Sequence, residues 1–230
     1  TKISQHHKNI AAALQLRLEE VVLSKLKFAK KKYKVSKLCI AGGVGLNCSL
    51  NGKILKSKIF DEIFVQPASG DSGVALGAVY ASMAERGSDL KVKKRHNHYL
   101  GSRYNDLSYL NYIKKNKINF KKSKNIFDDT AKFLKKGKIV GWFQGAAEFG
   151  PRALGNRSIL MNPMIKDGKN ILNKKVKHRE PWRPYGASVK KDKAKFYFDI
   201  DNSPYMLFSS KVLVPNMPAI THMDNTCRPQ

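Results

Sequence analysis

Apolar segments of two kinds alternate through the first 87 residues, and this alternation restricts the fold more than any other feature of the chain. In residues 9–31 the apolar side chains recur near the period of a helix, whereas the shorter segments are rich in β-branched residues. We expect helices at 9–31, 48–58 and 74–85, the last ended by Gly87, a buried strand at 35–41 and a second strand at 61–66. Because strands that alternate with helices pair in parallel, residues 1–87 are predicted to form an α/β unit.

Two glycine turns lie between the predicted strands and the helices that follow them. The first begins with Gly42 and Gly43 and runs to Asn47, and the second spans residues 67–73 and contains Asp71. Glycine lets the backbone turn sharply and lets N–H groups face a phosphate at a helix N-terminus. An aspartate in the second turn can ligate a hard cation or orient a ribose hydroxyl, or it can cap the helix. Neither turn has the full spacing of a dinucleotide-binding motif or a P-loop, so purely structural turns remain an alternative.

A change in composition separates this unit from the rest of the chain. Residues 88–125 are polar and rich in Lys, Asn and Tyr, which favours a linker between two domains. Residues 126–230 are predicted to form a second unit of the α+β class. In this unit we expect helices at 127–136, 169–176 and 194–198, and strands at 139–143, 185–189, 212–214 and 219–221.

Arginine is concentrated in the second unit, although lysine supplies most of the positive charge of the chain. Nine of the 44 basic residues are arginines, and four of these nine lie between Arg152 and Arg183. Lysine serves wherever a point charge is sufficient, whereas a planar fork that binds phosphate or carboxylate at two points requires arginine. The sequence therefore predicts an oxyanion site in this region.

The segment that carries Arg152, residues 148–158, is predicted to be rigid. It contains one proline and two glycines, which fix one backbone angle and permit tight turns, so that Arg152 has little entropy left to lose on binding. Other cations could converge on the same anion, namely Arg157, Lys177, Arg179, Arg183 and, in the polar stretch 222–228, Arg228. The alternative is a set of surface ion pairs with Glu148 and Glu180, and for Arg228 an ordinary loop.

The net charge of +27 raises the question of nucleic-acid binding. The lysines are spread along the chain, and aromatic residues are not interleaved with them as a stacking platform for bases requires. We therefore interpret the lysines as a solvated surface that attracts acidic small molecules.

The sequence contains no apolar run near the roughly 18 residues of a membrane helix and no signal-peptide pattern at its start. Cys39, Cys48 and Cys227 are odd in number and have no CxxC spacing. This argues against a disulfide framework or a zinc site and favours a reducing cytoplasm. Both ends of the sequence resemble cuts, and we expect a fragment of a longer polypeptide.

Four motifs occur in an order that resembles one family. They span residues 41–47, 70–78, 148–160 and 179–184. Together they resemble the O-carbamoyltransferases of nodulation and antibiotic biosynthesis, over residues 11–230. The last two motifs are highly specific, whereas the first two are shared more widely.

The resemblance implies two catalytic domains. The first is an ASKHA, actin-like ATPase fold, of which residues 1–87 would be the C-terminal half. It binds a nucleotide and a divalent metal, usually taken as iron, and transfers the carbamoyl group to a hydroxyl. The second is YrdC-like, with residues 126–230 as a truncated copy, and it makes carbamoyl adenylate from carbamoyl phosphate and ATP. The implied ligands are carbamoyl phosphate, ATP with Mg²⁺, and a small hydroxylated acceptor.

Carried over by position, the resemblance assigns roles to individual residues. The nucleotide site would be lined by Gly42, Gly43 and Asn47, and the metal ligand would be Asp71. Carbamoyl phosphate and the adenylate would be held by the catalytic residues Arg152, Arg183 and Arg228, with help from Arg157, Lys177 and Arg179. Fixed cations of this kind stabilise the charge that builds on the transferring group.

Three departures from the family pattern limit these expectations. Ala146 and Ala147 stand where the family has Arg-Met, so one cationic contact is expected to be missing. Asn225 replaces the glycine of an Asp-Gly-Thr motif, a milder change because asparagine tolerates left-handed backbone geometry. The His-rich metal motif of the family is absent, so Asp71 alone is not expected to hold a metal, and the chain by itself is not expected to complete carbamoyl transfer.

Two other classes of function stay open on the sequence alone. One is a basic module that binds tRNA, related to tRNA threonylcarbamoylation, which steep salt dependence of binding would reveal. The other is a degenerate family member with a structural or partner-binding role, an alternative kept open by Ala146 and Ala147. A membrane partner is not expected, nucleic acid is disfavoured, and a homodimer is compatible with the sequence.

Overall fold

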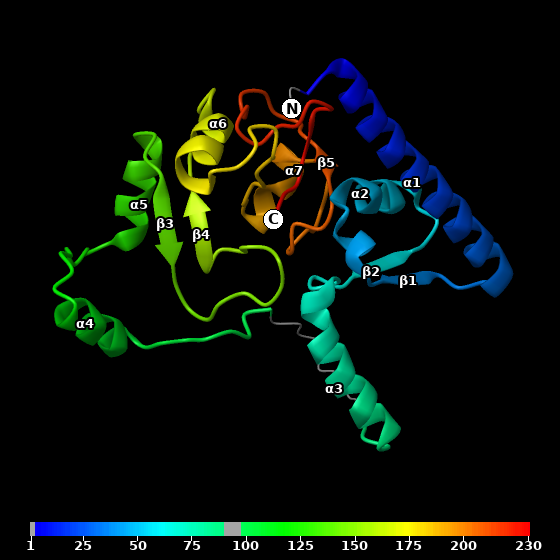
Figure 1. Ribbon diagram of the computed structural model, residues 1–230, viewed down its shortest axis with the longest axis horizontal. Helices are drawn as coiled ribbons and strands as arrows, with labels where there is room; N and C mark the ends of the chain where they lie inside the picture. The colour runs from blue at the N-terminus through cyan, green and yellow to red at the C-terminus, as the bar shows by residue number, and fades with distance from the viewer. Residues whose placement is uncertain (1–2, 90–97) are drawn as a thin grey trace.

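The computed structural model describes residues 3–89 and 98–230 of the chain (Figure 1). The helices and strands predicted for the first 87 residues are all present. They are α1 (Gln5–Tyr33), β1 (Lys37–Ile40), α2 (Cys48–Ser57), β2 (Glu62–Val65) and α3 (Val74–Glu85). The 3₁₀ turns η1 (Gly43–Leu46) and η2 (Asp71–Gly73) occupy the two glycine turns, directly before α2 and α3. Gly87 follows α3 with φ +72°, as expected for a residue that ends a helix.

The strands β1 and β2 pair in parallel, as their alternation with helices predicts. Lys37 lies opposite Glu62 and Ile40 lies opposite Val65. The burial of β1 differs from the prediction, because its side chains alternate between exposed and half-buried. Within the described residues β1 has β2 as its only partner strand, and so small a sheet covers little of its own surface. The expectation of a buried strand at 35–41 is therefore wrong in this respect.

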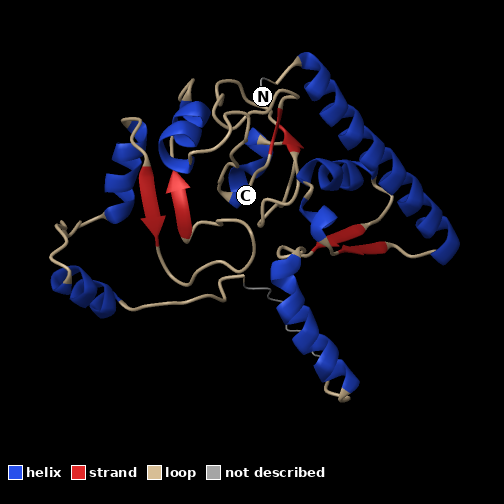
Figure 2. Ribbon diagram, in the orientation of Figure 1, coloured by secondary structure: helices blue, strands red, loops and turns tan. Residues whose placement is uncertain are grey.

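The rest of the described chain combines short helices with short strands (Figure 2). Its helical elements are α4 (Asp106–Lys115), α5 (Ile126–Lys135), α6 (Gly168–Leu172), the π-helical turn η3 (Asn173–Lys177), the 3₁₀ turn η4 (Lys191–Lys193) and α7 (Ala194–Tyr197). Its strands are β3 (Val140–Phe143), β4 (Arg157–Leu160), β5 (Ser210–Lys211) and β6 (Thr226–Cys227), paired as β3–β4 and β5–β6, both antiparallel. The fold of the described part is thus mixed α/β with small sheets.

Helix α4 lies inside the segment that its composition assigns to a linker. The side chain of Asn105 caps the helix by accepting a hydrogen bond from the backbone N–H of Ser108, 2.8 Å away. Asp106 in the first turn and two lysines in the last turn complement the helix dipole. The polar composition of residues 88–125 therefore conceals a well-capped helix, which Figure 1 shows between two irregular stretches.

Three predicted strands of the second unit are wrong or much reduced. Residues 219–221 belong to a turn, in which the N–H groups of Ile220 and Thr221 both donate to the carbonyl of Met217. Residues 185–189 and 212–214 contribute only single bridges, Ala187 to Pro229 and Val212 to Phe198. Their apolar composition reflects burial in the core and not strand pairing. In contrast, β4 was not predicted, because glycine, proline and arginine dominate the segment that leads into it.

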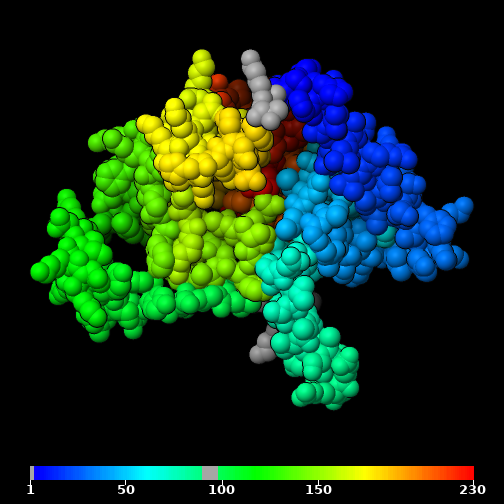
Figure 3. All heavy atoms as spheres, in the orientation of Figure 1, coloured from blue at the N-terminus to red at the C-terminus, as the bar shows by residue number. Residues whose placement is uncertain are grey.

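The main apolar core of the described chain lies in its C-terminal third. It consists of Ala187, Phe198, Ile200, Val212, Met217, Ile220 and Cys227. Helix α3 projects away from the rest of the molecule, as the ribbon and the space-filling view both show (Figures 1 and 3). None of the helices within residues 3–89 and 98–230 combines the length and apolar character needed to cross a membrane.

Candidate functional site

Segments that are distant in the sequence meet where α2 begins. The guanidinium of Arg152 donates through Nη2 to the backbone carbonyl of Leu46, the last residue of η1, over 3.0 Å. Gly150, with φ +115°, lies so close to the second glycine turn that a Cβ built on it would be 3.4 Å from the Cβ of Ala68. The structure thus brings the arginine segment against both glycine turns, three motifs that the sequence analysis identified separately.

The carboxylate of Glu148 organises the arginine segment from within. Its Oε1 atom accepts hydrogen bonds from the backbone N–H groups of Leu154, Asn156 and Arg157, at 2.7, 2.8 and 3.1 Å. Burial acts to raise the pKa of Glu148, but these backbone donors outweigh it and hold the pKa below its ordinary value. The alternative that Glu148 forms a surface ion pair with the arginines is therefore replaced by a structural role, which the sequence analysis missed.

The outer side of the same loop borders a cavity of about 450 Å³. The carbonyl oxygen of Leu154 accepts hydrogen bonds from the Tyr99 hydroxyl and from Nε2 of Gln230, each at 2.8 Å. Burial, and secondarily the charge of Glu148, raises the pKa of Tyr99. Tyr205 also lines the cavity, and burial likewise raises its pKa. The loop is therefore fixed on both sides.

Arg152 and Arg228 form the cationic centre of the site. Burial and, secondarily, the charge of Arg228 lower the pKa of Arg152 to about 10, against an opposing effect of Cys48. In residues 3–89 and 98–230 neither arginine forms an ion pair with a carboxylate. The Nε atoms of both are buried and have no hydrogen-bond partner there. Like charges held together in this way are costly unless an anion compensates them, so the pair is suited to bind one.

Two further groups belong to this centre. The charges of Arg228 and Lys169 both act on the ring of His222, which follows the turn at 218–220. The sequence did not identify Lys169 as a site residue, because lysine is so frequent in the chain. His222 was visible only as the first residue of the polar stretch 222–228, and a histidine so close to Arg228 in sequence is the clue that could have identified it.

The other predicted anion ligands have different contacts. Arg157 donates through Nη1 to the carbonyl of Gln144 at 2.6 Å and through Nη2 to the carbonyl of Ser102 at 3.2 Å. Its guanidinium also stacks on Phe143, 3.5 Å from the ring centroid. Arg183 is exposed and forms an ion pair with Glu180 at 3.4 Å. These contacts occupy Arg157 with backbone carbonyls of neighbouring segments and leave Arg183 at the surface.

Lys177 is the last residue of η3, and Arg179 lies in the loop after it, where it contacts the buried side chain of Asn173. The Oδ1 atom of Asn173 accepts from Nε of Arg179 at 2.7 Å and from the Tyr185 hydroxyl at 2.8 Å. Arg179 also lines a second cavity, of about 350 Å³, with Lys174 and His178 among its neighbours. Lys177 is exposed. Of the predicted anion ligands, the structure therefore brings together Arg152 and Arg228 and gives the others separate surroundings.

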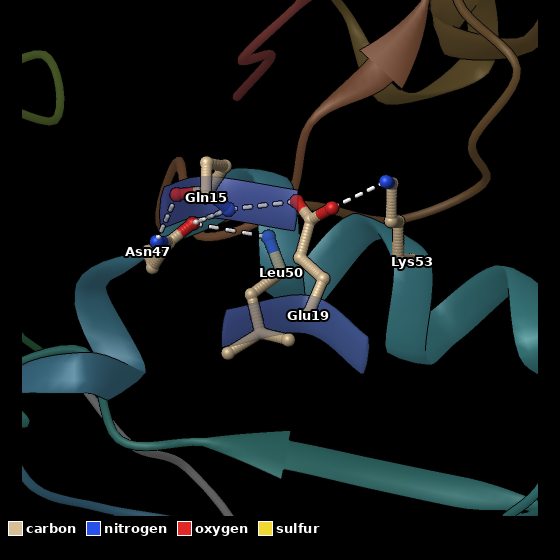
Figure 4. Close-up of polar contacts among 5 residues, drawn as sticks. All are labelled: Gln15, Glu19, Asn47, Leu50 and Lys53. Atoms are coloured by element: carbon tan, nitrogen blue, oxygen red, sulfur yellow. Dashed lines mark hydrogen bonds and ion pairs between the residues drawn. The ribbon is translucent and has the colours of Figure 1, made fainter. Parts of the chain in front are cut away.

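The predicted nucleotide residues lie in and beside η1. Gly42 has φ +92°, and a Cβ built on Gly42 or Gly43 would meet no atom within 4 Å, so this part of the turn faces open space. Asn47 is the N-cap of α2, and its Oδ1 accepts from the backbone N–H of Leu50 at 3.0 Å. Its amide also exchanges two hydrogen bonds with the side-chain amide of Gln15 in α1, at 2.8 and 3.2 Å (Figure 4). Asn47 thus fixes the turn, and the two glycines leave room beside it.

The same network contains a buried carboxylate. Glu19 of α1 accepts a hydrogen bond from Gln15 at 2.7 Å and forms an ion pair with the half-exposed Lys53 of α2 (Figure 4). Polar side chains therefore contribute to the contact between α1 and α2 next to the site.

Asp71, the predicted metal ligand, is exposed in the short turn η2. Residues 3–89 and 98–230 contain no group of three or more His, Cys, Asp or Glu side chains that could surround a metal ion. These residues alone do not provide the ligands that a bound metal requires.

Family models match both parts of the chain. The model described as carbamoyltransferase N-terminus matches residues 1–80, and the model described as carbamoyltransferase C-terminus matches residues 131–230.

Curated proteins are similar over nearly the whole chain. Nodulation protein NolO of Bradyrhizobium diazoefficiens is 38% identical over 99% of the chain, which spans 43% of that protein. Nodulation protein NolNO of Sinorhizobium fredii is 37% identical over 99% of the chain, which spans 35% of it. The 3'-hydroxymethylcephem-O-carbamoyltransferase of Amycolatopsis lactamdurans is 32% identical over 85% of the chain, which spans 36% of it. The chain therefore spans less than half the length of these relatives.

Proposed function

Because the chain belongs to the carbamoyltransferase family, we propose that the protein activates carbamoyl phosphate with ATP to carbamoyl adenylate and transfers the carbamoyl group to a hydroxyl of a small acceptor. The name of one relative, a 3'-hydroxymethylcephem-O-carbamoyltransferase, supports an O-linked acceptor. The cytoplasm is the proposed location, since all three substrates are soluble metabolites.

The observation that carries the proposal is the pair formed by Arg152 and Arg228. Carbamoyl phosphate is a small mixed anhydride of carbamic and phosphoric acids, with a doubly charged phosphate at one end. Two guanidinium groups that lie close together, without a carboxylate partner in the described residues, supply the opposite charge. Their planar forks also match the phosphate oxygens in geometry. The pair therefore binds the phosphate end and later stabilises the charge on the transferring group.

The position of Arg152 favours a site shared with ATP. Its guanidinium contacts the carbonyl of Leu46, at the end of the glycine turn that opens with Gly42 and Gly43. Backbone N–H groups of such a turn are suited to bind a polyphosphate. We assign the nucleotide to this turn, with Asn47 holding the turn in shape through its cap and its contact with Gln15.

A divalent metal is implied by the family, but the described residues do not fit one. Asp71 is exposed, and within residues 3–89 and 98–230 it belongs to no group of three or more His, Cys, Asp or Glu side chains that could hold a metal ion. No step of the proposal is therefore assigned to a metal held by this chain.

The test is direct binding of carbamoyl phosphate to the 230-residue chain by titration calorimetry. Arg152→Lys and Arg228→Lys keep the charge but lose the fork, and each is expected to weaken binding by about tenfold or more, since a charge-assisted hydrogen bond is worth roughly 1.5–3 kcal/mol. Arg103→Lys, the same change at an exposed arginine, is the control and is expected to bind like the wild type. Wild-type affinity in both site variants would show that the phosphate binds elsewhere.

A further inference from the structure

His222 is held in one orientation by the residues that follow it. Its backbone N–H donates to the carbonyl of Thr226 at 2.8 Å, and the N–H of Asn225 donates to the carbonyl of His222 at 3.1 Å. In the side chain, the Nδ1 atom lies 3.0 Å from Oγ1 of Thr226. The ring is therefore anchored through one of its two nitrogens.

The hydroxyl of Thr226 determines which ring nitrogen carries the proton. Its Oγ1 lies 2.7 Å from Oδ1 of Asp224, and because a carboxylate only accepts, the hydroxyl donates to Asp224. The Thr226 oxygen then accepts from Nδ1–H of His222. In the neutral ring this places the proton on Nδ1 and leaves the lone pair on Nε2.

The Nε2 atom is buried and has no hydrogen-bond partner in the described part of the chain. Burial lowers the pKa of His222, Asp224 opposes this effect, and the charges of Arg228 and Lys169 lower the pKa further. The ring is therefore neutral near pH 7, and Nε2 is an acceptor that lacks a donor. A buried acceptor of this kind costs free energy unless a ligand supplies the missing N–H or O–H group.

We propose that Nε2 of His222 accepts a hydrogen bond from the amide group of carbamoyl phosphate and so selects this ligand over acyl phosphates that have no N–H donor. The inference rests on the proposed function, in which Arg152 and Arg228 bind the phosphate end. Arg228 acts electrostatically on both Arg152 and His222, so one guanidinium connects the phosphate site with the acceptor.

Acetyl phosphate is the informative comparison. It has the same phosphate and carbonyl groups as carbamoyl phosphate and a methyl group where the other has its amide. A site built around a hydrogen bond to an N–H group discriminates strongly against an analogue without it, because the acceptor is then left unpaired. The ratio of the two affinities therefore measures the contribution of His222. A change that weakens the binding of both ligands equally measures the contribution of the arginines.

The experiment measures the binding of carbamoyl phosphate, acetyl phosphate and inorganic phosphate to the 230-residue chain by titration calorimetry. The wild type is expected to prefer carbamoyl phosphate over acetyl phosphate by about tenfold or more. In His222→Leu the ratio is expected to fall to about one, and His222→Gln, whose amide oxygen can serve as the acceptor, is expected to recover part of it. His6→Leu, at the exposed start of α1, is the matched control and should keep the wild-type ratio.

The outcomes separate this inference from the proposed function. If the wild type binds none of the three ligands, or if Arg152→Lys binds acetyl phosphate as well as the wild type does, the anion site is overturned and the role of His222 with it. If the ligands bind through the arginines but the wild type does not discriminate, only the role of His222 is overturned. The same conclusion follows if His222→Leu keeps the wild-type ratio, or if a folded His222→Gln is no more selective than His222→Leu.

Discussion

Helices α1 and α3 differ from residues 187–228 in how they bury apolar side chains, although α2 and β2, which lie between the two helices in sequence, do contain buried apolar residues such as Ile54 and Val65. In α1, Leu14, Leu16 and Phe28 are exposed, and the only buried side chain is the carboxylate of Glu19. Helix α3 has no buried residue, although it is the most apolar helix of the described chain. In the second region seven apolar residues form one cluster around Phe198. An apolar sequence pattern thus leads to exposure in α1 and α3 and to burial in residues 187–228.

The difference indicates that polar contacts hold a larger part of α1 in place than they do in the cluster around Phe198. The cluster around Phe198 gains free energy from the removal of apolar surface from water. Next to the site, α1 and α2 are joined by polar contacts between Gln15 and Asn47 and between Glu19 and Lys53 (Figure 4). Such contacts contribute less in net free energy, because water competes for the same groups. We therefore expect the C-terminal region to dominate the stability of the chain.

The sharpest test of this comparison changes the same residue type in both regions. Phe198 is 1% exposed and Phe28 is 64% exposed. Phe198→Ala creates a cavity in the core and is expected to lower the free energy of unfolding by about 3–5 kcal/mol. Phe28→Ala is expected to change it by about 0.5 kcal/mol or less. Urea titrations followed by circular dichroism measure both values.

A large cost of Phe28→Ala would break the comparison. It would mean that the exposed face of α1 is covered in solution, either by a second copy of the chain or by another polypeptide. Repeating the titration at several protein concentrations identifies self-association, since only a dimer becomes more stable as the concentration rises.

The arginine segment provides the next largest expected effect, because it has a polar centre in place of an apolar one. Glu148→Ala removes the acceptor of three backbone N–H groups and is expected to cost about 1–3 kcal/mol. Glu180→Ala, which removes an exposed ion-pair partner of Arg183, is the control and is expected to cost less than about 1 kcal/mol. Equal costs would show that the loop does not depend on its carboxylate.

The effect of Glu148 has a defined pH dependence. Its pKa is lowered in the folded protein, so its contribution is fully present above the unfolded pKa of about 4.3 and is lost as the pH falls through the folded value. The difference in unfolding free energy between wild type and Glu148→Ala is therefore expected to be constant from pH 8 to about pH 5 and to shrink below about pH 4. A difference that stays constant down to pH 3 would contradict the role of the charge.

The sequence predicts the local elements of both regions well and their burial poorly. The helical period of α1 and the glycine turns before α2 and α3 are properties of neighbouring residues, and both appear in the structure. Whether Leu14 is covered depends on a partner surface that periodicity does not contain. For the same reason residues 219–221 were predicted as a strand, although their apolar side chains enter the core from a turn.

The candidate site shows the same limit. The arginine segment and the glycine turns were recognisable from residue types alone, and in the structure the charge of Arg228 acts on Arg152. Which arginines converge depends on tertiary contacts, which residue spacing does not predict. Arg157, for example, stacks on Phe143 and donates hydrogen bonds to backbone carbonyls. Glu148 is defined by the backbone N–H groups that it accepts from, and His222 by the neighbouring hydroxyl of Thr226. The charges in the sequence predict neither contact.

The smallest expected effect concerns the polar contact that joins α1 to α2. Asn47 and Asn105 are both N-caps, accepting from the backbone N–H of Leu50 and Ser108. Replacement by alanine is expected to cost about 1 kcal/mol at each cap. Asn47→Ala should cost about 0.5 kcal/mol more than Asn105→Ala, because only Asn47 also pairs with a side chain of another helix, Gln15.

A double-mutant cycle on Gln15→Ala and Asn47→Ala isolates that excess, with an expected coupling of about 0.5–1 kcal/mol. The size of this coupling shows whether α1 stabilises the glycine turn at the site. If it is present, α1 stabilises the turn that contacts Arg152 through this amide pair, and Gln15→Ala should also weaken phosphate binding slightly, by about two- to threefold. If it is zero while the cap still contributes, α1 is not coupled to the turn through this pair, and the turn is positioned by η1 and by its contact with Arg152.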